Sequence, residues 1–180
     1  YWLMAAFYSI PLNERWDELG SLSARLPSAL SALFMMMMIA DTIFCSNKKL
    51  KENVLLSLIA SLSFLLSPLI IIWSRTAVSD SLLCATLGAS LLSFWRKISS
   101  EDESICIIPW LFLAFAILTK GPVAFVITFA TLFTYFLTHK NWKRLFLKIN
   151  PTKGILITFL ISSPWYFLQL AQKGNVFWDS

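Results

Sequence analysis

Four short polar stretches interrupt an otherwise apolar sequence, and each contains residues that could take part in binding a substrate. The first, 74–80 (SRTAVSD), contains Arg75 and Asp80. An arginine binds phosphate through paired hydrogen bonds, and an aspartate can position a cation, a sugar hydroxyl or a helix terminus. The alternative is a plain loop in which the two side chains pair with each other or contact lipid headgroups.

The second stretch, 118–122 (LTKGP), places Lys120 between two apolar runs. Gly121 permits an unusual turn, and Pro122 suits the first position of a helix, so a helix can begin directly after the lysine with its free amides nearby. This pattern predicts a phosphate site. Snorkelling of the lysine toward lipid headgroups explains the same position equally well.

The third stretch, 163–166 (SPWY), lies near the end of the last apolar run. A proline kink within an interfacial aromatic belt is the favoured explanation of this stretch. The alternative is that Trp165 and Tyr166 line a site for a sugar or an isoprenoid chain, to which Tyr166 offers a ring and a hydroxyl.

The fourth stretch, 14–27, contains two charged candidates. Glu14 is a candidate for lining the substrate site, and Arg25 can bind headgroups or the same phosphate as Arg75. Pro27 is expected in the first turn of the helix that follows.

Membrane-spanning helices must position these residues, because 57% of the chain is hydrophobic and only 14% is charged. A bilayer core of about 30 Å needs about 20 apolar residues per helix. We therefore expect an all-α membrane protein with one transmembrane domain over 1–180 and a short interfacial helix at 1–11. The six expected spans are 24–45, 54–73, 81–95, 105–119, 121–138 and 155–172.

The apolar residues 105–138 must form two helices, since a single one would be about 51 Å long. The break at 119–122 is therefore predicted to be a hairpin turn.

The basic residues predict the orientation of these spans. Ten of the 15 lysines and arginines fall in the loops 46–53, 96–104 and 139–154, which we place in the cytoplasm. The candidate site is then extracytoplasmic. Because this topology accounts for the net charge of +5, nucleic acid is not expected as a partner. No cofactor is predicted, although the sequence does not exclude a divalent metal.

Four segments, taken in order, carry a resemblance to a known family. They are YWLMAAFYSIPLNERWDELGSLSARLPSAL, SPLIIIWSRTAVSDSLL, LAFAILTKGPVAFVI and SPWYFLQLAQKGNVFW. Together they resemble the bacterial membrane glycosyltransferases related to the aminoarabinose lipid A transferase and the protein O-mannosyltransferases.

This resemblance implies a helical membrane domain of the GT-C type. It implies an inverting transfer of a hexose or an aminoarabinose-like sugar from a polyprenyl-phosphate donor to a lipid, glycan or protein acceptor. The base would belong to an acidic motif upstream of Tyr1, so we expect 1–180 to be an inactive piece of a longer protein. Asp80 matches the second acidic position of the family. Arg75, Lys120 and Arg25 are the candidates for the donor phosphate.

Two other classes of function remain open. A transporter or lipid flippase would also hold charged residues within its membrane part, but it is expected to show broken helices and inverted repeats, and neither is visible in the sequence. An assembly module would tolerate replacement of Arg75, Asp80 and Lys120.

Overall fold

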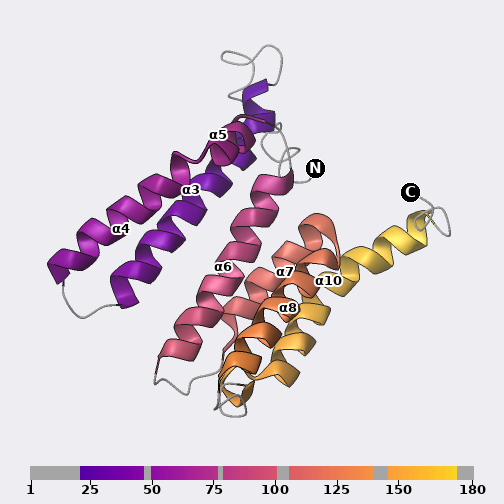
Figure 1. Cartoon of the computed structure of the whole chain (residues 1–180). Helices are drawn as coiled ribbons and strands as arrows, with labels where there is room; N and C mark the ends of the chain where they lie inside the picture. The colour runs from indigo at the N-terminus through magenta and orange to yellow at the C-terminus, as the bar shows by residue number, and fades with distance from the viewer. Residues whose placement is uncertain (1–20, 47–49, 77–78, 101–105, 140–145, 174–180) are drawn as a thin grey trace. The chain divides into compact units, whose positions relative to one another are not determined.

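The computed structural model describes residues 21–46, 50–76, 79–100, 106–139 and 146–173. Within these residues every regular element is a helix, which confirms the predicted all-α class (Figure 1). The chain forms two compact units, unit 1 over residues 1–88 and unit 2 over residues 89–180. The expected interfacial helix at 1–11 and the candidate Glu14 lie outside the described residues.

Unit 1 is built on a hairpin of α3 (Ser21–Ser46) and α4 (Leu50–Leu65), which lie side by side in Figure 1. Small polar side chains let the two helices approach closely. The Ser57 hydroxyl on α4 donates to the carbonyl of Ala40 at 2.9 Å, and the Asn53 amide donates to that of Phe44 at 3.4 Å. Such cross-helix hydrogen bonds, together with close packing of small residues, help helices to associate in lipid, where burial of apolar surface provides no driving force.

The expected span 54–73 is broken. After α4 the chain enters α5 (Pro68–Arg75) with a bend of 61°. Pro68 causes the break, because proline has no N–H and disfavours helical backbone at the preceding residue. Ser67 accordingly has φ −59° and ψ 127°, and α5 begins directly after it. The stretch expected as the span 54–73 therefore consists of two helices, which are long and apolar enough for a membrane span only together, as one bent pair.

Unit 2 contains the second half of α6 (Ser79–Ser99) together with α7 (Ile108–Lys120), α8 (Val123–Thr138) and α10 (Pro151–Lys173). α7 is central, since it contacts both α8 and α10. Its buried Trp110 donates through Nε1 to the Ile149 carbonyl at 2.9 Å and meets Phe94 of α6 edge to face at 5.1 Å. One side chain therefore fastens three segments together.

The C-terminal end of α6 and the N-terminal end of α10 extend into residues that were expected to form loops. Residues 96–99 and 151–154 are helical, although both stretches contain basic residues that end the apolar runs. Hydropathy marks where the apolar run ends, but a helix can continue beyond that point because its backbone hydrogen bonds also form in water. Lys148 supports the end of α6 by donating to the carbonyls of Ile98, at 3.2 Å, and Ser100.

Two of the described helices, over 24–45 and 151–171, are long and apolar enough to cross a membrane. The bent pair of α4 and α5 becomes a third if it acts as one span, while α7 and α8 are shorter apolar helices. The chain is a membrane protein, and the count of six spans stays a prediction. Pro27 was expected in the first turn of its helix, but α3 begins earlier, at Ser21, and Pro27 lies inside it.

Candidate functional site

Three of the predicted site residues lie at one end of unit 1. Arg25 belongs to the N-terminal part of α3, Arg75 is the last residue of α5, and Asp80 is the second residue of α6. α5 packs on α3, and the Ser81 hydroxyl donates to the carbonyl of Ser28 at 2.8 Å, which holds the start of α6 against the start of α3. Figure 1 shows the three helix ends together at this end of the unit.

The local backbone explains how Arg75 and Asp80 are presented. Thr76 ends α5 in an extended conformation, with its N–H bonded to the carbonyl of Trp73 and its hydroxyl bonded to that of Ile72 at 3.1 Å. Arg75 is exposed and Asp80 is half-buried. A carboxylate in the first turn of a helix interacts favourably with the helix dipole, so Asp80 has a local structural role in addition to any chemical one.

The other predicted cation, Lys120, lies in unit 2 at a tight turn. α7 ends at Lys120, Gly121 adopts φ +79° and ψ −157°, and α8 begins at Val123. This confirms the hairpin predicted for 119–122, with the small difference that Pro122 caps α8 and is not its first residue. Lys120 is exposed at this end of the unit.

Tyr166 on α10 reaches this same turn. Its hydroxyl donates to the carbonyl of Ile117 at 3.2 Å, and this carbonyl also accepts the N–H of Gly121 at 2.7 Å. Tyr166 and its neighbour Trp165 are both half-buried. α10 continues through Pro164 and changes direction along its course in Figure 1. Pro164 supplies a physical cause for the bend, because it removes one helical hydrogen bond.

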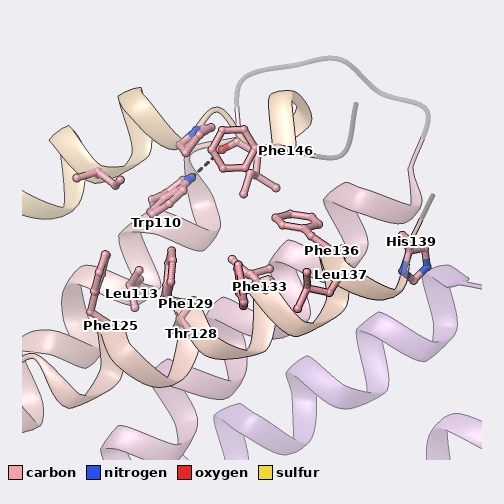
Figure 2. A pocket seen from close by; sticks show the side chains of 14 residues that line it. Trp110, Leu113, Phe125, Thr128, Phe129, Phe133, Phe136, Leu137, His139 and Phe146 are labelled. Atoms are coloured by element: carbon pink, nitrogen blue, oxygen red, sulfur yellow. Dashed lines mark hydrogen bonds between the residues drawn. The ribbon is translucent and has the colours of Figure 1, made fainter. Parts of the chain in front are cut away.

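An aromatic groove in unit 2 was not anticipated. It has a volume of about 610 Å³. Figure 2 shows the side chains that line it, which come from α8, from the start of α10 and, with Trp110 and Leu113, from α7. The α8 wall carries aromatic rings at every third or fourth position: Phe125, Phe129, Phe133 and Phe136. That helical spacing was visible in the sequence and could have identified the wall.

The groove ends at His139, whose ring stacks on Tyr135 with ring centroids 4.0 Å apart. Its lining is apolar apart from Thr128, His139 and the Trp110 indole N–H, which is already bonded to Ile149. Hydrocarbon therefore suits the groove better than a sugar or a phosphate.

The predicted site is thus divided between the two units. Unit 1 holds Arg25, Arg75 and Asp80, and unit 2 holds Lys120 together with Trp165 and Tyr166. Across the described ranges, no group of three or more His, Cys, Asp or Glu side chains is arranged to hold a metal ion.

Known proteins provide an independent comparison. Residues 1–167 match the family described as dolichyl-phosphate-mannose-protein mannosyltransferases. Over 145 residues the chain is 30% identical to the undecaprenyl phosphate-alpha-4-amino-4-deoxy-L-arabinose arabinosyl transferase of Wigglesworthia glossinidia brevipalpis. The alignment covers 78% of this chain and 24% of that relative, so the chain spans about a quarter of the length of the curated relative it matches. No solved structure matches the chain.

Proposed function

The chain belongs to the dolichyl-phosphate-mannose-protein mannosyltransferase family, and on this premise we propose that the complete protein transfers a sugar from a polyprenyl-phosphate donor to an acceptor hydroxyl. The match over residues 1–167 is the observation that carries the proposal. The exposed cations at helix ends support it, because a lipid-linked sugar presents its phosphate near the membrane surface, where such cations can reach it.

The chemistry requires cations and a base. The acceptor oxygen attacks the anomeric carbon, the bond from that carbon to the phosphate oxygen breaks, and the hydroxyl proton passes to a carboxylate. The polyprenyl phosphate leaves with its additional negative charge. Cations placed beside this phosphate lower the barrier, because they meet charge that develops in the transition state. Arg75, Lys120 and Arg25 are proposed for this role.

The acidic residues have separate roles in the proposal. Asp80 is the second acidic residue and orients the donor or the acceptor, while Glu14 and Trp165 line the substrates. The base itself is proposed to lie upstream of Tyr1. The sugar is a hexose, as the family name suggests, or an aminoarabinose-like pentose, as the name of the Wigglesworthia relative suggests. The acceptor is a lipid, a glycan or a protein.

A transporter or flippase function is the second candidate, and the break between α4 and α5 favours it. The sequence had shown no broken helix, but the 61° bend at Ser67–Pro68 is of the kind that transporters place near their substrates. The family match favours transfer over transport.

Turnover of a polyprenyl-phosphate-linked sugar by the full-length protein in membranes tests the proposal. We expect Arg75→Ala and Lys120→Ala each to lower kcat/KM by roughly 100-fold, as removal of a charge-stabilising group typically does. Asp80→Asn should also lower it. Lys153→Ala is the matched control, because this exposed lysine lies in the first turn of α10, at the opposite end of unit 2 from Lys120.

The outcomes separate the candidate functions. Unchanged turnover in Arg75→Ala, Lys120→Ala and Asp80→Asn would remove the site assignment and favour an assembly module. Wild-type movement of labelled lipid across vesicle membranes, without any sugar transfer, would instead favour the flippase.

A further inference from the structure

We propose that Tyr166 is a positioning residue, which sets the direction of Lys120 by fixing the last turn of α7, and does not itself contact the sugar. The inference rests on the proposed function, because it assumes that Lys120 binds the donor phosphate. It revises the substrate-lining role that the sequence suggested for Tyr166.

The hydrogen bonds at the turn carry the first step of the argument. The carbonyl of Ile117 accepts both the N–H of Gly121, at 2.7 Å, and the hydroxyl of Tyr166, at 3.2 Å. Lys120 lies between Ile117 and Gly121 in the chain, so its backbone is held by this doubly bonded carbonyl. A carbonyl has two lone pairs, and here each has a donor.

The turn also approaches Tyr166 closely. A Cβ atom placed on Gly121 would lie 3.5 Å from the tyrosine hydroxyl, which is ordinary van der Waals contact. The Tyr166 hydroxyl is therefore directed at the backbone of the turn. Thr119 completes the local bonding by donating to the carbonyl of Ala116 at 2.6 Å.

α10 is also held against α7 at a second place, on the other side of Pro164 from Tyr166. The Thr158 hydroxyl donates to the Trp110 carbonyl at 3.3 Å, and the Trp110 ring fits against Gly154, where no side chain intervenes. Because α10 is attached at both Thr158 and Tyr166, it cannot slide along α7 without breaking these two hydrogen bonds. The position of the Tyr166 hydroxyl, and through it the last turn of α7, is thereby determined.

The long, flexible side chain of Lys120 makes this control necessary. The lysine is exposed, and an ammonium group on a four-carbon stem has many conformations. If the backbone of the turn also moved, the ammonium charge would be spread over a large volume. Binding of a phosphate would then have to order the side chain and the backbone together. A fixed turn removes part of that cost before binding.

A double-mutant cycle on the full-length protein in detergent tests the proposal, with the affinity for a short-chain polyprenyl phosphate as the measured quantity. We expect Tyr166→Phe to weaken binding by roughly 3- to 10-fold, the usual effect of one hydrogen bond. In a Lys120→Ala background the same change should have no further effect. Tyr135→Phe on α8 is the matched removal of a tyrosine hydroxyl, and it should leave affinity unchanged.

Each result decides the question. Equal weakening by Tyr166→Phe with and without Lys120 would mean that the tyrosine acts independently, as a ligand contact or through general stability, and would overturn the positioning role. Unchanged affinity in Tyr166→Phe, with clear weakening in Lys120→Ala, would overturn it while leaving the proposed function intact. Unchanged affinity in Lys120→Ala would reject the phosphate assignment in the proposed function, and the positioning role with it.

Discussion

Gly154 offers a sharp test of the packing in unit 2. A Cβ atom at this position would lie 2.0 to 2.2 Å from ring atoms of Trp110, far inside the roughly 3.5–4.0 Å at which carbon atoms pack. Trp110 is only 4% exposed and its indole N–H is bonded to the Ile149 carbonyl, so the ring cannot retreat freely. We expect Gly154→Ala to destabilise the protein.

The magnitude follows from three contributions. Overpacking of a buried site costs about 1–3 kcal/mol, and loss of the Trp110 hydrogen bond adds about 0.5–1.5 kcal/mol. The higher helix propensity of alanine returns about 1 kcal/mol. The free energy of unfolding should therefore fall by about 0.5–3.5 kcal/mol, as measured by reversible denaturation in mixed micelles and followed by circular dichroism.

Gly88→Ala on α6 is the matched comparison. Its Cβ would approach the Cε and Sδ atoms of Met35 at 2.4 and 2.7 Å, which is also too close. These atoms form the end of a flexible side chain that can change rotamer, so the cost should be small and the gain in helix propensity should offset it. If Gly88→Ala proved as destabilising as Gly154→Ala, the distinction between a fixed ring and a mobile thioether would be refuted.

Two further predictions concern the turn and the topology. Gly121→Ala should lower the free energy of unfolding by about 1–3 kcal/mol in the same denaturation assay, because φ +79° with ψ −157° is a region that essentially only glycine adopts; an unchanged value would show that the turn relaxes. Single-cysteine labelling of the full-length protein in intact cells should place positions 75 and 120 on the same, extracytoplasmic side and position 153 on the cytoplasmic side. Labelling of 75 and 120 on opposite sides would remove the basis for a shared phosphate site.

Local signals explain what the sequence could predict about the fold. The turn at 119–122 was identified because Gly121 and Pro122 stand at the junction of two apolar runs, and both act through their own backbone. The break before Pro68 carried the same kind of signal but was missed. It lies inside a continuous apolar run, and hydropathy reports compatibility with lipid rather than continuity of the helix.

Tertiary pairing explains what the sequence could not predict about the site. Lys120 and Tyr166 were both singled out, but nothing local indicates that α10 packs on α7. The hydrogen bond from Tyr166 to the carbonyl of Ile117, one turn before Gly121, was therefore not foreseen. The gathering of Arg25, Arg75 and Asp80 at one end of unit 1 likewise depends on a contact between distant segments, the hydrogen bond from Ser81 to Ser28. The proposed roles of these residues remain predictions.

The aromatic groove has a practical consequence for handling the protein. α8 and α10 both pack on α7, and the aromatic groove between them is lined almost entirely by apolar side chains. Detergent tails differ from phospholipid tails in length and bulk, so the two will fill the aromatic groove to different extents. Extraction conditions should therefore change the rigidity of this half of the chain, and measurements made in different solubilising agents should be compared only after exchange into a common bilayer.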